Sequence, residues 1–114
     1  MIGLPSVIEQ LKLEAISSVD LVNRSVMGGY ASDLLSCAMR GAKKDFLWVT
    51  LQSHVNVVAV ASLLNLTGVI ITEGNRPALE TIAQAEKEKV ILLLTPNNTF
   101  SVVGQLNLLG INGE

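Results

Sequence analysis

Four polar side chains spaced two residues apart follow an apolar run of strand length. The run is Phe46–Leu51, and the side chains belong to Thr50, Gln52, His54 and Asn56. If the chain stays extended past Leu51, alternation along a strand points all four to one side. Their hydroxyl, amide and imidazole groups suit hydrogen bonding to a polar or phosphorylated ligand without strong charge. Ligands gather where strands end and helices begin, so this junction is the predicted site.

The same residues also have a purely structural interpretation. Ser53 can cap the helix that follows, while Gln52 and His54 bond to neighbouring loops. His54 is the only histidine, and a lone histidine is more often structural than catalytic. Both interpretations remain open at this point.

A glycine pair and two further loops can contribute to the same edge. Gly28 and Gly29 precede a predicted helix and can form an anion nest, or a tight turn that uses the freedom of glycine. Asp33 in the first turn of that helix would repel a phosphate, which favours the turn. The loop residues can line the cleft or act as ordinary turn and cap residues. They are Glu73, Gly74, Asn75 and Arg76 after one strand, and Thr95, Asn97 and Asn98 after the next.

The sequence lacks a recognisable catalytic constellation. One histidine and one cysteine form a dyad only by chance of folding, and no two carboxylates have a familiar spacing. Metal ligation needs several histidines or clustered carboxylates. We therefore predict no enzymatic activity, no metal and no cofactor.

The elements that would hold these residues alternate between strand and helix. Each predicted strand is a continuous apolar run, which is typical of parallel strands covered on both faces. Gly110 followed by Ile111 predicts a left-handed helix end with an apolar contact behind it. The predicted strands are Phe46–Leu51, Gly68–Thr72 and Val90–Leu94, and the predicted helices are Asn56–Asn65, Pro77–Lys89 and Phe100–Leu109.

The first third of the chain continues the alternation. A short helix at Leu4–Leu11 and a strand at Glu14–Ser17 come first, followed by a strand at Leu21–Met27 that ends at the glycine pair. The next predicted helix, Ala31–Arg40, has Leu34, Leu35, Ala38 and Met39 facing inward. We predict one α/β domain over residues 1–114, a three-layer α/β/α sandwich around a mostly parallel sheet of about five strands.

Composition narrows the class of protein. Apolar residues make up 49% of the 114 residues and charged residues only 16%, so a homodimer that hides an apolar face is expected. The net charge of −2 and the scattered basic residues argue against a nucleic-acid partner. Cys37 is the only cysteine, which fits a reducing cytoplasm. We expect neither a signal peptide nor a membrane span.

Several segments together resemble the DRTGG domain. They are Gly29–Leu35, Leu47–Thr50, Gly68–Pro77, Ile91–Thr95, Thr99-Phe100 and Gly104–Leu106, so the likeness covers most of the chain. The resemblance implies a fold similar to the N-terminal domain of HPr kinase/phosphorylase. DRTGG domains occur beside CBS domains in some pyrophosphatases and ahead of the catalytic domain in some phosphate acetyltransferases. There they look like accessory, dimer-forming regulatory units.

The chain departs from this family just after one of its strands. Members often carry an Asp-Arg pair after the strand equivalent to Leu47–Leu51, whereas Ser53 and His54 stand here, with Asn56 where a second Asp is common. Small stand-alone members of the family are often labelled as an HPr serine kinase. The chemistry of that kinase needs a phosphate-binding loop ending in lysine, which this sequence lacks.

Three functional hypotheses follow. The leading one is a non-catalytic regulatory or scaffolding domain that self-associates and docks on a larger enzyme or signalling protein. The alternative is a sensor that binds a nucleotide or other phosphorylated metabolite at the carboxyl edge of the sheet. The weakest is an enzyme whose site a partner chain completes.

Overall fold

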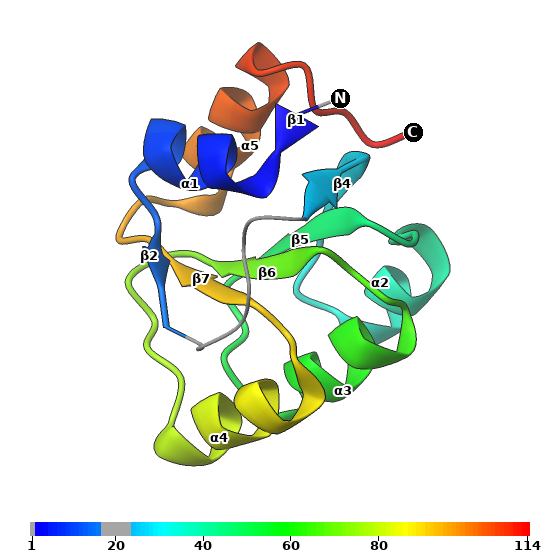
Figure 1. Ribbon diagram of the computed structural model, residues 1–114, viewed down its shortest axis with the longest axis vertical. Coiled ribbons are helices and arrows are strands. Elements are labelled where there is room, and N and C mark those ends of the chain that lie inside the picture. Colours follow the sequence, from blue (N-terminus) through cyan, green and yellow to red (C-terminus); the bar gives the residue numbers. More distant parts are fainter. Residues whose placement is uncertain (1, 17–23) are drawn as a thin grey trace.

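A five-stranded sheet with helices on both faces forms the centre of the computed structural model, which describes residues 2–16 and 24–114 (Figure 1). The strand order is β2-β7-β6-β5-β4, in which β4 to β7 are parallel and β2 is an antiparallel edge strand. These strands are β2 (Glu14–Ala15), β4 (Gly28–Ala31), β5 (Phe46–Thr50), β6 (Gly68–Ile71) and β7 (Leu92–Leu94). The predicted α/β sandwich with a mostly parallel sheet is confirmed.

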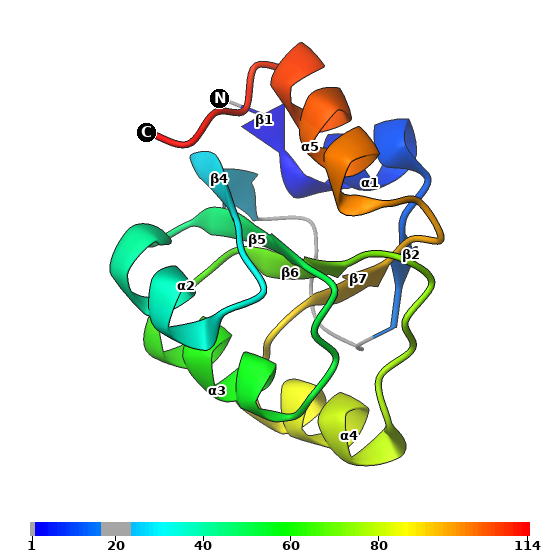
Figure 2. The ribbon, with the colours of Figure 1, turned by 180° about the vertical axis from the view of Figure 1, so that it is seen from behind.

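Right-handed crossovers explain how the helices divide between the two faces. Because β4, β5, β6 and β7 are neighbours in chain order, each crossover helix falls on the same face of the sheet. The helices α2 (Leu35–Gly41), α3 (Asn56–Leu63) and α4 (Leu79–Glu88) cover that face, while α1 (Leu4–Leu11) and α5 (Thr99–Leu108) cover the other (Figures 1 and 2). A small antiparallel pair, β1 (Ile2–Gly3) and β3 (Ser25–Val26), lies near the start of the chain.

The core is split by the sheet into two clusters. Along β5, Phe46 and Trp48 pack toward α2, α3 and α4, whereas Leu47 and Val49 pack toward α1 and α5. Every residue of β5 is buried, because both faces are covered. The apolar runs seen in the sequence are therefore central strands of a sandwich, as expected for a covered parallel sheet.

The region after residue 24 differs from the sequence-based prediction. The chain does not turn at Gly28-Gly29, because both glycines lie in β4 and pair with Phe46 and Leu47. Residues 17–23 lie outside the described residues, so the predicted strands Glu14–Ser17 and Leu21–Met27 are seen only in part. β4 continues to Ala31, and α2 therefore starts four residues later than the predicted Ala31. The later start turns Leu34 and Met39 to the surface, while Ala38 is buried as predicted.

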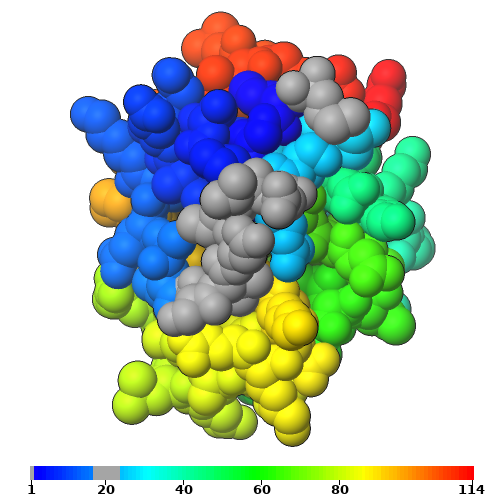
Figure 3. Space-filling model, viewed as in Figure 1, coloured from blue at the N-terminus to red at the C-terminus, as the bar shows by residue number. Residues whose placement is uncertain are grey.

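The remaining helix and strand boundaries agree with the prediction to within two residues. Gly110 has a φ of +90°, and the N–H of Ile111 donates to the carbonyl of Leu106 at 3.1 Å, as the predicted left-handed helix end requires. The space-filling view shows the N-terminal residues (blue) in the upper part of one face and α4 (yellow) at its foot (Figure 3). No helix within residues 2–16 and 24–114 has the length and apolar character needed to cross a bilayer.

Candidate functional site

Each of three parallel strands ends in a buried threonine at the carboxyl edge of the sheet. Thr50 follows the apolar residues of β5, Thr72 directly follows β6 and Thr95 directly follows β7. Their side chains are at most 3% exposed. A buried hydroxyl needs a hydrogen-bond partner, so these threonines organise the loops that start beside them. The repeated pattern of apolar residues followed by threonine is a sequence signal for this arrangement.

Asp33 organises the loop after β5. Its Oδ1 accepts hydrogen bonds from the Thr50 hydroxyl and from the backbone N–H of Leu51, both at 2.9 Å. The side-chain amide of Gln52 donates to the Asp33 carbonyl at 3.2 Å, and the Gln52 N–H donates to the Thr50 hydroxyl at 3.1 Å. The carboxylate thus takes two donors that an anionic ligand would otherwise use. From the sequence, Asp33 was expected only to repel a phosphate, and this structural role was not predicted.

His54 accepts hydrogen bonds from the first backbone N–H groups of α3. Its Nδ1 accepts a hydrogen bond from the backbone N–H of Asn56 at 3.1 Å, and its carbonyl accepts from the N–H of Val57 at 3.0 Å. The structural interpretation with Ser53 as the capping side chain is wrong, because the imidazole accepts the helical N–H instead. Helix α3 begins at Asn56, so the extended chain expected to align all four polar side chains ends before that residue.

A tight turn follows β6. The N–H of Asn75 donates to the carbonyl of Thr72 at 3.2 Å, and the two residues between them have positive φ values of 65° for Glu73 and 72° for Gly74. Two central residues with positive φ are typical of a type I′ turn, a conformation that suits glycine. The Asn75 side-chain amide donates to the carbonyl of Leu51 at 2.7 Å. This bond ties the loop after β6 to the loop after β5.

The loop after β7 is tied to the same turn. Glu73 donates its N–H to the carbonyl of Asn97 at 2.8 Å, and its carboxylate accepts from the N–H of Thr99 at 3.0 Å. The hydroxyls of Thr72 and Thr99 lie 2.7 Å apart. The Asn98 side chain accepts from the N–H of Ser101 at 2.8 Å and so caps α5, as the structural alternative for this loop predicted.

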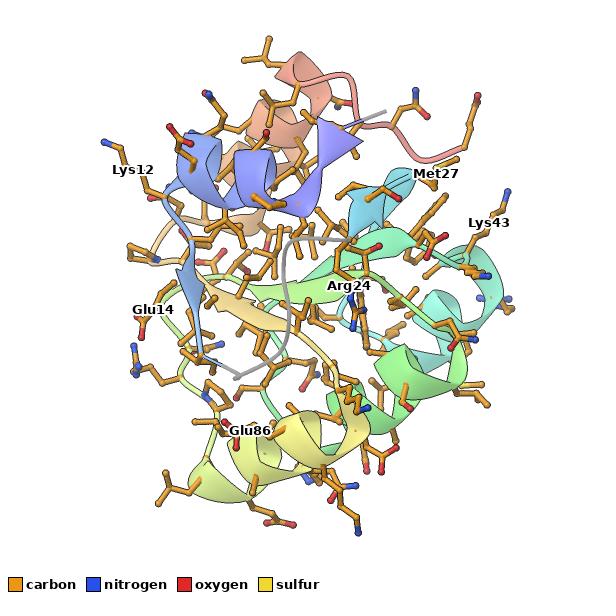
Figure 4. The ribbon with its side chains drawn as sticks, in the orientation of Figure 1. Lys12, Glu14, Arg24, Met27, Lys43 and Glu86 are labelled. Atoms are coloured by element: carbon orange, nitrogen blue, oxygen red, sulfur yellow. The ribbon has the colours of Figure 1, made fainter. Side chains whose placement is uncertain are left out.

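Arg76 makes the only ion pair that the described part of the chain contains. Its guanidinium contacts both carboxylate oxygens of Glu14 on β2, at 3.2 and 3.1 Å. Glu14 lies at the edge of the sheet with its side chain directed outward (Figure 4). The Arg76 guanidinium lowers the pKa of Glu14, through the hydrogen bonds first and the charge second. Arg76 does clamp a carboxylate, but one that belongs to its own chain.

Two open cavities flank Arg76. One has a volume of about 490 Å³ and brings together Gln52, His54, Asn75 and Arg76 of the predicted site, with Glu80 and Thr81 of α4. The other, of about 320 Å³, lies between Lys12 and the loops and includes Gly74 and Thr95. Among the other predicted site residues near this edge, neither cavity is lined by Thr50, Asn56, Glu73, Asn97 or Asn98. No group of three or more histidine, cysteine, aspartate or glutamate side chains able to hold a metal exists in residues 2–16 and 24–114.

The glycine pair belongs to the opposite end of the sheet. Gly28 pairs with Phe46, the first residue of β5, whereas the candidate site lies where β5 ends. Gly29 donates its N–H to the carbonyl of Asn112 at 2.9 Å and lines a separate groove of about 350 Å³ beside α5. The structure therefore separates Gly28 and Gly29 from the other predicted site residues.

Comparison with solved structures identifies a fold shared with a regulatory region. The CBS and DRTGG domains of a Clostridium perfringens pyrophosphatase, solved in complex with the activator diadenosine tetraphosphate, match with a TM-score of 0.72 at 16% identity. The match covers 91% of this chain and 45% of that chain, so this chain spans less than half of its length. No protein-family model and no curated protein sequence matches the chain.

Proposed function

We propose that this chain is a DRTGG-type, non-catalytic regulatory or scaffolding domain that self-associates and docks on a larger enzyme or signalling protein. The observation that carries the proposal is a set of large apolar side chains, 38 to 90% exposed, on a chain with few charges. Where exposed apolar side chains lie together they mark protein–protein contacts, so these residues are the candidates for such a surface. The set comprises Met27, Leu34, Met39, Leu51, Leu63, Leu79, Phe100 and Leu108.

The carboxyl edge supports a non-catalytic role. The polar groups that would activate a substrate are bonded to one another, as in the Asp33–Thr50 and Arg76–Glu14 pairs. Catalysis needs a nucleophile and a base within reach of each other and of a substrate. One solved structure with this fold is a regulatory region, which agrees with such a role.

Sedimentation velocity over a range of protein concentrations tests self-association. We expect a concentration-dependent dimer, and a monomer at every concentration would contradict the proposal. Crosslinking in the native cells identifies the protein on which the chain docks. Mixing the purified chain with that purified protein then tests docking. Failure to bind that protein in the reconstituted mixture would contradict docking while leaving self-association intact.

A sensor function is the second candidate, favoured by the cavity of about 490 Å³ that joins His54, Asn75 and Arg76. Adenine nucleotides are the first ligands to test, since the structural neighbour was solved with diadenosine tetraphosphate. A ligand at ~100 times its dissociation constant adds about 2.7 kcal/mol and raises the unfolding midpoint by roughly 10 °C. The shift should disappear in His54→Ala and persist in Gln105→Ala, which changes an exposed residue on α5. No shift with any nucleotide would contradict the sensor.

A further inference from the structure

Helix α5 carries large apolar side chains on the side that faces away from the sheet as well as on the side that faces it. Val102 and Leu106 are buried against the sheet, whereas Phe100 and Leu108 are 90% and 88% exposed. These two have the highest exposed fractions among the large apolar side chains of the described residues. Exposed apolar side chains that lie together mark a contact surface, and on α5 they lie beside the exposed polar residues Ser101, Gln105 and Asn107. In both ribbon views, none of the labelled elements lies beyond α5 (Figures 1 and 2).

Gly104 lies midway between these two side chains. Phe100, Gly104 and Leu108 are spaced four residues apart and form one stripe along the helix, which we call the outer stripe of α5. A methyl group added at Gly104 would meet no atom within 4 Å. Glycine disfavours a helix interior relative to alanine, and packing within this chain does not require it here. The close approach of another backbone would require it.

The absence of charged side chains around α5 indicates what kind of partner fits this surface. The sequence has no charged side chain between Lys89 and Glu114, so α5 and its flanking residues are uncharged throughout. A charged partner surface would lose hydration on this face without gaining an opposite charge. A second copy presents the same uncharged stripe, as an isologous two-fold contact demands.

We propose that α5 packs antiparallel against α5 of a second copy, with the two helices crossing at Gly104. In this arrangement Phe100 of each copy contacts Leu108 of the other, and the missing side chain at the crossing lets the backbones approach. Antiparallel packing also sets the helix dipoles in opposite directions. This proposal rests on the proposed self-association and assigns its surface.

Two charge substitutions and their mixture test the arrangement. Phe100→Asp places an acid in the first turn of α5 and Leu108→Lys places a base in the last, where the helix dipole tolerates each charge. Both side chains are exposed, so circular dichroism of each variant should match the wild type. Each should raise the dimer dissociation constant at least tenfold in sedimentation equilibrium. Ala83→Asp, which places the same charge at an exposed position of α4 outside the set of exposed large apolar side chains, is the control and should leave it unchanged.

An equimolar mixture of the two variants distinguishes antiparallel from parallel packing. Antiparallel helices place the new carboxylate of one chain against the new ammonium group of the other, so dimers should form again. Parallel helices offer no such pair, and a mixture that stays monomeric would overturn the antiparallel arrangement. Gly104→Leu, whose added Cβ meets no atom of its own chain within 4 Å, should also disrupt the dimer by holding the backbones apart.

The outcomes separate this proposal from the proposed function. If both charge variants dimerise as tightly as the wild type, the outer stripe of α5 is not the contact, although self-association stands. If the wild-type chain is a monomer throughout, self-association itself is wrong and this proposal fails with it.

Discussion

The Asp33 carboxylate accepts a hydrogen bond from the Thr50 hydroxyl at 2.9 Å, so the segment after β4 is joined to the end of β5. The same oxygen accepts from the backbone N–H of Leu51 at 2.9 Å. Thr50 is fully buried and Asp33 lies at the surface, so the bond connects the core to the rim of the candidate site. The two loops therefore hold one another in place.

Replacing Asp33 by alanine should destabilise the fold. The change removes both hydrogen bonds and leaves the buried Thr50 hydroxyl without this acceptor, which typically costs about 1–3 kcal/mol. Asp33→Asn keeps an oxygen at the same place and should lose less. Urea unfolding followed by circular dichroism measures both. A loss of less than about 0.5 kcal/mol for Asp33→Ala, the range of neutral surface substitutions, would contradict this role.

The sheet could be predicted from the sequence because its strands are continuous apolar runs. Phe46–Thr50 and Gly68–Ile71 have no polar residue on either face before their terminal positions, and burial on both faces leaves few alternatives. The Gly28–Ala31 strand escaped prediction because glycine favours turns in local terms. Here Phe46 and Asn112 lie so close to Gly28 that a side chain there would collide with them.

The candidate site was predicted only in part. Residue types and strand ends placed Thr50, Gln52, His54 and Arg76 at the carboxyl edge, and the structure places them there. The partners of Thr50 and Arg76 were missed, because Asp33 and Glu14 come from segments distant in the sequence. Which polar groups pair with one another depends on the strand order, and no local pattern encodes that order.

Trp48 should tolerate even a conservative change poorly. Its side chain is fully buried, and its Nε1 donates a hydrogen bond to the carbonyl of Ser32 at 2.8 Å. Trp48→Phe removes this donor and leaves a cavity, so we expect a loss of about 2–4 kcal/mol in the free energy of unfolding. Urea unfolding followed by circular dichroism measures it. The exposed Leu79→Ala is the control, and a loss of less than about 1 kcal/mol for Trp48→Phe would argue against tight packing.

Two glycine-to-alanine changes should have opposite effects. A methyl group at Gly28 would lie 2.6 Å from Cε1 of the buried Phe46 and 2.8 Å from the carbonyl oxygen of Asn112. Gly28→Ala should therefore cost about 1–3 kcal/mol through overpacking. Gly104→Ala meets no atom within 4 Å and improves helix propensity, so dilute protein should gain up to ~1 kcal/mol. Thermal unfolding compares the two, and equal effects would refute this account of the close packing at Gly28.

The Glu14–Arg76 pair should make stability depend on pH in the acidic range. Because Arg76 lowers the pKa of Glu14 in the folded chain, the unfolded chain binds the proton more readily. The stabilisation is present above the ordinary pKa of 4.5 and is lost as the pH falls through the lower folded value. Both side chains are more than half exposed, so salt should weaken the effect. An NMR titration of the Glu14 carboxyl carbon tests this. Arg76→Gln should raise the pKa of Glu14 toward its ordinary value. An unchanged titration of Glu14 in that variant would show that Arg76 does not lower this pKa.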